Sequence, residues 1–403
     1  MDHAATTPVD PRVSGKMSQY LGCDGIFANA SSATHAAGHQ AREAVDEARH
    51  LVGDLIGAFP HEIIWTSGAT ESINIAIKGI MRSPTLRGRH MITSCLEHSA
   101  VLDTCKALEC EGVDVTFLSP DADGLMTADV IQPALRDDTA LVSLMHVNNE
   151  VGTVTDIRAI GHLVRERGIL FHVDAAQGAA RLPLDAQADG IDLISLSAHK
   201  FYGPKGAGAL YIRDSLQSVI VPLTHGGGQE RGIRAGTLPT HQIVGLGEAA
   251  GLVRDQRQAD NKHLVALEAQ LFRGLTDIEH VIVNGSPSHR VPGLINLAFP
   301  CVDSAALLLA LRDKVALSSG SACTSLQSAP SHVLRGLGVA NDRAMSSIRI
   351  SLGRFTTAQE IDFVATCLRT HVASLRALSP AWEAYQTDIS AASPVETEHT
   401  GLA

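Results

Sequence analysis

The chain is poor in several features that would each indicate a particular class of protein. Only 4% of its 403 residues are aromatic and its formal net charge is −11, so neither a base-stacking surface nor a basic nucleic-acid footprint is expected. No apolar run approaches the ~20 residues of a membrane-spanning helix. The segment Met1–Pro8 has neither the basic nor the apolar region of a secretory signal. We therefore expect a cytoplasmic protein that binds neither nucleic acid nor a membrane.

Cysteine is scarce and irregularly spaced. The seven cysteines are an odd number and include no Cys-x-x-Cys pair, which argues against a disulfide framework and a structural zinc site. Cys105, Cys110 and Cys367 fall in helical patterns and are expected to be structural. Cys323 differs because Ser318–Ser325 surrounds it with small polar residues, and an exposed free thiol is a liability unless it has a function. The alternative for Cys323 is the usual fate of a free cysteine, a small buried hydrophobic residue.

The hydrophobic pattern predicts an α/β protein. Between about residues 60 and 215, strand-like runs alternate with helical patterns, which favours a mostly parallel sheet covered by helices on both faces. The expected strands are Glu62–Thr66, His90–Ser94, Val113–Leu118, Leu141–Val147, Ile169–Val173, Ile191–Leu196, Val281–Val283, Leu294–Phe299 and Ile348–Ile350.

The pattern changes after residue 251, where helical spacing of leucines is interrupted by isolated strands. A capping-box pattern at Thr357–Glu360 predicts the start of a further helix. We expect a large domain over residues 13–255, a smaller α+β domain over residues 1–12 and 256–385, and a flexible tail over residues 386–403.

A lysine directly after an apolar strand is the first candidate catalytic residue. Lys200 follows the run Ile191–Leu196 and lies beside Ser197 and His199. A lysine in such a pocket can lose its proton and form a Schiff base with an aldehyde, which pyridoxal phosphate (PLP) enzymes require. The alternative is a solvated surface lysine. Together with the thiol of Cys323, however, this amine indicates PLP chemistry on a sulfur-containing substrate.

Further positions fit the needs of a PLP site. Asp174 ends a strand at the edge where open α/β sheets bind ligands, and a carboxylate there keeps the pyridine nitrogen protonated; its alternative role is a helix cap. Gln177, one turn later, is placed to hydrogen-bond the ring oxygen. Ser67–Thr70 offers backbone amides to a phosphate, unless it is only a capped helix start. His98 follows a strand and can stack on a cofactor, although a lone histidine is more often a core residue.

These residues together make the chain similar to the cysteine desulfurases, PLP enzymes of aminotransferase fold type I, and in particular to those that serve iron–sulfur cluster assembly. The resemblance extends from Asp2 to about Tyr385. It rests on Ala5–Asp10, Thr66–Ser72, Met145–Glu150, His172–Gln177, Ser197–Lys200, Gly226–Thr237, Ser318–Ser325 and Ile348–Thr356.

The resemblance implies a role for each matching residue. Lys200 would carry PLP and move substrate protons, and His98 would stack on the ring and act in acid–base steps. Cys323 would take the sulfur of L-cysteine as a persulfide and leave L-alanine. Asp174 would pair with the pyridinium nitrogen and Gln177 with the ring hydroxyl. The other implied positions are Ala69, Thr70, Ser197 and His199 for the phosphate, Thr237 for the phosphate in the second subunit of a homodimer, Asn149 for the cofactor, and Asn149 with Arg349 for the substrate carboxylate.

The implied function is a cysteine desulfurase that passes sulfur to an iron–sulfur scaffold protein or to other acceptors. A selenocysteine lyase or an aminotransferase is the alternative within this fold, and a non-catalytic scaffold protein is the alternative outside enzymes. No resident metal is expected, although a mobile Cys323 thiolate could briefly ligate a cluster. The chain departs from the family pattern at two single positions, Ala30 and Ala198. The apolar strand that usually precedes the position of Asp2 is missing, and the sequence beyond about Tyr385 does not follow the family.

Overall fold

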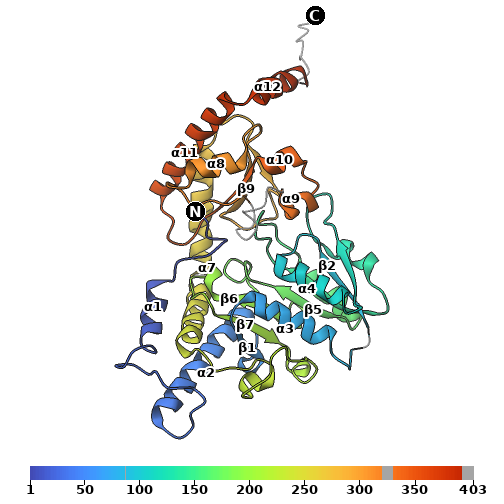
Figure 1. Cartoon of the computed structure of the whole chain (residues 1–403), viewed down its shortest axis with the longest axis vertical. Helices are drawn as coiled ribbons and strands as arrows, with labels where there is room; N and C mark the ends of the chain where they lie inside the picture. Colours follow the sequence, from blue (N-terminus) through green and yellow to red (C-terminus); the bar gives the residue numbers. More distant parts are fainter. Residues whose placement is uncertain (87, 320–329, 393–403) are drawn as a thin grey trace, which may run out of the picture.

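Two sheets of different size organise the chain. The computed structural model describes residues 1–86, 88–319 and 330–392. In these residues a seven-stranded sheet forms a larger lobe, and a three-stranded sheet forms a smaller lobe beside it (Figure 1). The larger sheet carries helices on both faces, as predicted for an α/β protein of fold type I.

The strands of the larger sheet lie in the order β1-β7-β6-β5-β4-β2-β3. Only β7 (Gly208–Ile212) is antiparallel to its neighbours, and it is absent from the strands that the sequence predicts. The other strands run parallel to one another and, except for the edge strand β3, consist mainly of buried residues, as expected for strands covered on both faces. They are β1 (Ile63–Thr66), β2 (His90–Ser94), β3 (Asp114–Leu118), β4 (Thr139–Met145), β5 (Leu170–Asp174) and β6 (Leu193–Ser197).

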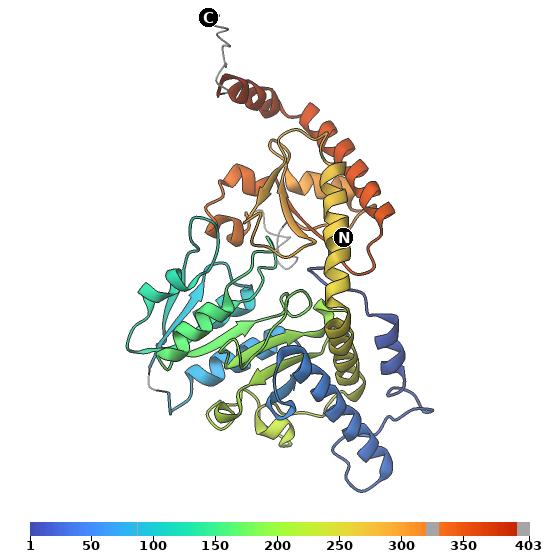
Figure 2. The ribbon, with the colours of Figure 1, turned by 180° about the vertical axis from the view of Figure 1, so that it is seen from behind.

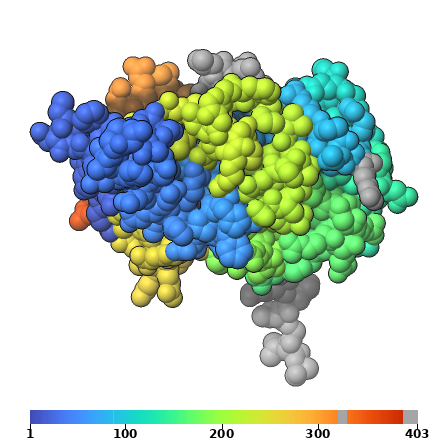
Figure 3. Space-filling model, turned by 90° about the horizontal axis from the view of Figure 1, so that it is seen from below, coloured from blue at the N-terminus to red at the C-terminus, as the bar shows by residue number. Residues whose placement is uncertain are grey.

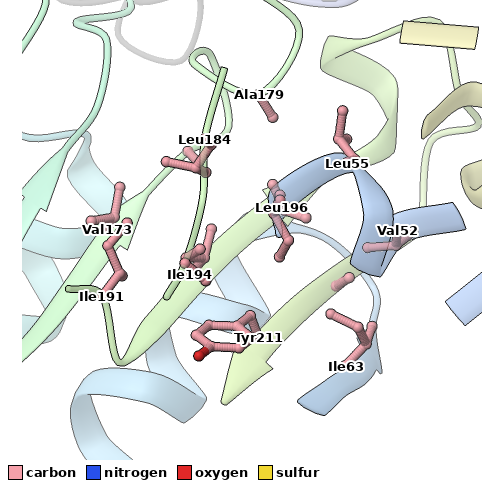
Figure 4. Packing of buried hydrophobic residues seen from close by; sticks show 14 of the residues in the cluster. Val52, Leu55, Ile63, Val173, Ala179, Leu184, Ile191, Ile194, Leu196 and Tyr211 are labelled. Carbon is pink, nitrogen blue, oxygen red and sulfur yellow. The ribbon is translucent and has the colours of Figure 1, made fainter. Parts of the chain in front are cut away.

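Alternate residues of the strands belong to two separate hydrophobic cores, one on each face of the larger sheet. On β1, Ile63 and Trp65 belong to the core shared with α2 and α7, whereas Ile64 packs with α3 on the other face. Figure 4 shows Ile63 and Tyr211 from neighbouring strands in the first of these cores, close to Val52 of α2. Because successive side chains of a strand point to opposite faces of the sheet, one strand contributes to the packing of the helices on both faces.

Twelve α-helices complete the part of the chain that the structure describes. Gly57 ends α2 in the left-handed conformation at a φ of 64°, which favours glycine because it lacks a Cβ. The helices are α1 (Pro11–Ser18), α2 (Ala36–Ile56), α3 (Ala69–Met81), α4 (Ser99–Glu109), α5 (Ala128–Ile131), α6 (Ile157–Glu166), α7 (Thr240–Gly274), α8 (Ser304–Leu311), α9 (His332–Gly336), α10 (Asn341–Met345), α11 (Ala358–Ala377) and α12 (Pro380–Ala392).

The smaller sheet is antiparallel, in the order β10-β9-β8. Its strands are β8 (Ile282–Asn284), β9 (Leu294–Ala298) and β10 (Ser347–Ser351). Helix α11 covers this sheet and begins at the predicted capping box, where Thr357 accepts from the backbone of Glu360 and the Glu360 side chain accepts in return. The core between α11 and this sheet also takes Leu264, Leu267 and Leu271 from α7.

Helix α7 connects the two lobes without interruption (Figure 2). Its first half packs on α1 and α2, and its second half packs on α11. The expected boundary at residue 255 therefore falls inside one helix, and the division into domains stays a prediction. Helix α12 likewise continues to Ala392, past residue 386, where the sequence places the start of the tail.

The segment after β7 returns to α2. Figure 3 shows this segment in yellow-green beside the blue N-terminal region. The two are joined by Glu230, which is 6% exposed and accepts hydrogen bonds from Arg49 at 2.5 and 2.9 Å and from the backbone of Trp65 at 2.8 Å. In the described ranges no helix combines the length and the apolar character needed to cross a membrane.

Candidate active site

One cavity of about 530 Å³ brings most of the predicted site residues together. The carboxyl ends of β5 and β6, the N-terminus of α3 and one residue of β10 line it, together with the first residues of the chain. Ten of the predicted positions are among the lining residues: Ala69, Thr70, His98, Asn149, Asp174, Gln177, Ser197, His199, Lys200 and Arg349. Residues more than 270 positions apart thus share one site.

Lys200 ends a short 3₁₀ turn directly after β6. Its Nζ donates hydrogen bonds to the carbonyl oxygens of Ala4 at 2.7 Å and Ala5 at 2.9 Å. The amide of Gln177 donates to the same Ala4 carbonyl at 2.8 Å. The segment that contains Ala4 and Ala5 therefore orients two of the predicted cofactor-contacting side chains.

Asp174 is the last residue of β5 and is 6% exposed. Burial raises the pKa of its carboxyl group, whereas the backbone N–H of Ala176 and the charges of His98 and Lys200 oppose the rise. The N–H of Ala176 donates to Oδ1 at 3.0 Å. A buried carboxyl that has so little solvation is stabilised as an anion by a cation placed beside it, so the site favours a protonated ring nitrogen there.

His98 caps the N-terminus of α4. Its Nδ1 accepts a hydrogen bond from the backbone N–H of Ala100 at 3.1 Å. Burial lowers the pKa of the ring, Lys200 lowers it further, and Asp174 acts in the opposite direction. The ring is therefore neutral near pH 7 and, because Nδ1 is the acceptor, carries its proton on Nε2.

The other end of the cavity has the features of an anion cradle. The first backbone N–H groups of α3, at Ala69 and Thr70, have no partner within the helix. A Cβ on Gly208 of β7 would lie 2.5 Å from the Cα of Gly68, so only glycine lets the sheet approach the start of α3 this closely. His199 bonds through Nδ1 to the hydroxyl of Thr6 at 3.1 Å, and burial with the charge of Lys200 lowers its pKa to about 4.

Arg349 reaches the cavity from β10 of the smaller lobe and is 1% exposed. Its Nη2 donates to Asp2 at 2.8 Å and to the hydroxyl of Ser318 at 3.4 Å, and its Nη1 donates to the Asn149 carbonyl at 2.8 Å. The guanidinium is thereby fixed at the cavity that Lys200 also lines. Such a rigid fork suits a carboxylate.

Of the remaining predicted positions, one is described but does not line this cavity, and one lies outside the described residues. Cys323 lies outside the described residues. Thr237 is exposed and is not among the residues that line the cavity of its own chain. Of the cysteines that the structure describes none lines the cavity either, and burial raises the pKa of Cys105 to about 12, so its thiol is not reactive near neutral pH.

Sequence reasoning missed the contribution of residues 2–6. Asp2 holds Arg349, Ala4 and Ala5 accept from Lys200, and Thr6 bonds to His199. The motif Ala5–Asp10 was part of the resemblance, but it carries no titratable side chain with an obvious catalytic role near its start. The carbonyls of Ala4 and Ala5 leave no signal in a sequence, and the side chains of Asp2 and Thr6 are too far along the chain from their partners to form a local pattern.

The residues present fit PLP. Two polar atoms in this cavity are buried without a hydrogen-bond partner among the described residues: Oδ1 of Asn149 and Nε of Arg349. Such atoms are costly unless a ligand satisfies them. Together with the unpaired amides of α3, the buried carboxyl of Asp174 and the amine of Lys200, they match a ligand with a phosphate, a basic ring nitrogen and an aldehyde.

Comparison with known proteins decides the family. The model of the aminotransferase class-V family matches residues 1–364. The chain belongs to this family. Relatives named cysteine desulfurase IscS include one from Tolumonas auensis, 54% identical over 389 residues, and one from Aeromonas salmonicida, 52% identical over 389 residues; each alignment covers 96% of both chains. The predicted kinship with PLP-dependent cysteine desulfurases is thus confirmed.

Solved structures of this family have the same fold. A NifS-like protein is 34% identical, with a TM-score of 0.85 over 92% of this chain and 98% of its own. SspA in complex with cysteine is 40% identical, with a TM-score of 0.77 over 88% and 99%. DndA from Streptomyces lividans is 38% identical, with a TM-score of 0.73 over 87% and 98%. The predicted fold type I class is therefore confirmed.

Proposed function

We propose that this cysteine desulfurase takes sulfur from L-cysteine, releases L-alanine and holds the sulfur as a persulfide on Cys323 for an iron–sulfur scaffold protein or another acceptor. The observation that carries the proposal is the cavity in which the amine of Lys200, the buried carboxyl of Asp174 and the guanidinium of Arg349 face one space. Arg349 is the carboxylate clamp, so the substrate is an amino acid rather than a simple thiol.

PLP, when bound, withdraws electrons from the substrate and so weakens the bonds at its Cα and Cβ. This withdrawal needs a positive charge on the pyridine nitrogen of the cofactor. The buried carboxylate of Asp174, close to the expected ring position, stabilises that charge. Lys200 holds the cofactor through its amine and, when released, carries a proton to and from the substrate. The carbonyls of Ala4 and Ala5 position its Nζ for both tasks.

Sulfur transfer balances without an external oxidant. The thiolate of Cys323 attacks the sulfur of the bound cysteine, an S–S bond forms and the Cβ–Sγ bond breaks. The electron pair of the broken bond stays with the substrate carbons, and Cβ takes up a proton to give alanine. Cys323 keeps the sulfur as a persulfide, which an acceptor thiol can then remove.

Asn149 and Arg349 bind the substrate carboxylate, and Ala69, Thr70, Ser197 and His199 bind the phosphate. Thr237 completes the phosphate site of the other subunit of a homodimer; its exposure in the single chain supports this assignment. We assign the protein to the cytoplasm, where thiols remain reduced and the persulfide survives.

The test is an assay of the purified holoprotein with L-cysteine and a reducing thiol, in which alanine and sulfide are measured together. Equal amounts of both are expected. Cys323→Ser is expected to keep the visible absorbance of bound PLP and to lose sulfide release. Undiminished sulfide from this variant would refute the assignment of Cys323, and absence of both products from the wild type would refute the proposed activity.

A selenocysteine lyase and an aminotransferase predict other results. A lyase specific for L-selenocysteine would leave L-cysteine largely unused, and an aminotransferase would consume a 2-oxo acid without releasing sulfide. The cysteine substrate is favoured because the relatives at 52–54% identity bear the name of cysteine desulfurases. Parallel assays with the two amino acids and with a 2-oxo acid separate the three activities.

A further inference from the structure

A second cavity of about 880 Å³ lies behind the catalytic one. Consecutive residues at the end of β4 separate the two spaces, because Met145 lines the first cavity and His146 lines the second. The second cavity is bounded by the end of α2, the middle of α7 and the loop after β8. Its apolar floor includes Leu55 and Leu184, which Figure 4 shows within the core.

Most charges around this cavity are already satisfied. Asp156 accepts from the backbone N–H of Ala159 at 3.1 Å, and Asp185 accepts from backbone N–H groups that follow it at 2.9 and 3.1 Å. Three of the lining arginines are paired with acids: Arg158 with Asp189 at 2.7 Å, Arg254 with Asp54 at 2.8 Å, and Arg290 with Glu268 at 3.0 Å.

Arg257 is the exception. It lies half-buried on α7 and, within the described part of the chain, makes no hydrogen bond or ion pair; its Nε is buried without a partner. Burial alone lowers the pKa of its guanidinium. A half-buried cation without a counter-charge is unfavourable, so the fold retains here a positive charge that its own residues do not neutralise.

His146 lines the same cavity and is 4% exposed. Neither ring nitrogen hydrogen-bonds to another described residue, and Nδ1 is fully buried against Gly178, where a Cβ would lie 2.4 Å away. Burial lowers the pKa of the ring to about 4; Asp189 opposes the shift and Arg257 adds to it. The charge of Arg257 therefore acts on the ring, and the neutral imidazole has a hydrogen-bonding site to offer.

We propose that this second cavity binds a small molecule that bears a carboxylate or phosphate group, with Arg257 as its charged anchor and His146 as a hydrogen-bond partner. An oxyanion supplies the counter-charge that Arg257 lacks and accepts from the imidazole N–H. The neighbouring acids limit the ligand to a compact anionic group. The bound molecule lies next to the end of β5, since the backbone N–H of His146 donates to the carbonyl of Asp174 at 2.9 Å.

The test is calorimetric titration of the holoprotein, in a buffer free of other oxyanions, with inorganic phosphate and separately with succinate. Saturable binding of one of the two is expected. Arg257→Gln should weaken it at least about tenfold, Arg257→Lys should retain most of it, and Arg82→Gln, which removes an exposed arginine paired with Glu111, should not change it. Because Arg257 has no partner in the fold and its unpaired charge is unfavourable there, its variants should unfold at or above the wild-type temperature in the absence of anion.

Binding of phosphate alone supports the site and assigns a phosphate-bearing ligand, and binding of succinate alone supports it and assigns a carboxylate. Absence of saturable binding of either probe overturns the proposal. Equal affinities of the wild type and Arg257→Gln also overturn it, because the anion would then be bound at Arg349 or at another site.

Discussion

The two walls of the catalytic cavity are built in different ways. On the larger lobe, Asp174 and Ser197 end neighbouring strands of a parallel sheet, and Lys200 follows directly, so the backbone alone places them side by side. On the smaller lobe, Arg349 is fixed by side-chain and carbonyl contacts to Asp2, Ser318 and Asn149, which are distant in sequence.

This difference predicts that the two walls affect different kinetic parameters. In the proposed function the residues at the ends of the parallel strands hold the cofactor, and they should determine the rate of the chemical step. In the proposed function the contacts around Arg349 hold the group that binds the substrate carboxylate, and they should determine mainly the KM for L-cysteine. Each substitution below tests one side of this division.

Lys200→Ala should have the largest effect. The variant loses the amine that donates to the carbonyls of Ala4 and Ala5. Because this amine is the proposed group that holds PLP and moves substrate protons, kcat for alanine formation should fall about 1,000-fold or more. Lys205→Ala, which removes an exposed lysine at the same cavity, is the matched control and should retain most activity. Comparable rates for the two variants would contradict the role of Lys200.

Arg349→Lys should act mainly on binding. The lysine keeps the positive charge but cannot reproduce the planar fork, so the KM for L-cysteine should rise about 10- to 100-fold with a smaller change in kcat. Steady-state kinetics over a wide cysteine range measure both parameters, and thermal unfolding checks that the buried site tolerates the change. A large fall in kcat at unchanged KM would show that the two walls are not divided as proposed.

Asp2→Asn should have a smaller effect in the same direction. The amide can still accept from Arg349 but no longer provides a charged partner, so the KM should rise about two- to tenfold while kcat changes little. Asp24→Asn, at an exposed loop position near the same end of the chain, is the control and should behave as the wild type. An unchanged KM in Asp2→Asn would mean that Arg349 is fixed without this contact.

Acid pH should destabilise the fold through a buried histidine of the larger sheet. Burial lowers the pKa of His172 to about 3, and its ring nitrogens bond to Ser143 and Ser195 at 2.8 and 2.9 Å. The unfolded chain binds a proton at this histidine below about pH 6.5 and the folded chain does not, so stability falls as the pH is lowered from 6.5 toward 3. The unfolding temperature of His172→Gln should depend less steeply on pH over this range; an equal slope would contradict the assignment.

The contrast between the walls also explains how far the sequence could be interpreted. The larger-lobe positions follow strands in short motifs, so their chemistry and their place in the fold could be predicted together. The contact between Asp2 and Arg349 joins residues at opposite ends of the chain and has no local pattern. Only the family resemblance assigned Arg349 a role, and nothing in the sequence indicated what holds it.

One strand that the sequence did not predict, and one change of pattern along the chain, have equally local causes. Strand β7 begins with Gly208 and Ala209, which have low strand propensity, and it is stabilised by pairing with β1 and β6 on both sides. Helix α7 changes from small residues such as Gly245, which packs closely on Met17 of α1, and Gly247, which packs closely on Ala48 of α2, to leucines that face the smaller sheet. The change in pattern marks a change of neighbours, not the end of an element.

The most direct test of the account is a single turnover of the holoprotein with one equivalent of L-cysteine, followed by mass spectrometry of its peptides and measurement of alanine. The account predicts one alanine for each sulfur atom gained, with the added sulfur on the peptide that contains Cys323. Alanine formation with the sulfur on another cysteine, or a sulfur-bearing Cys323 without alanine, would contradict it.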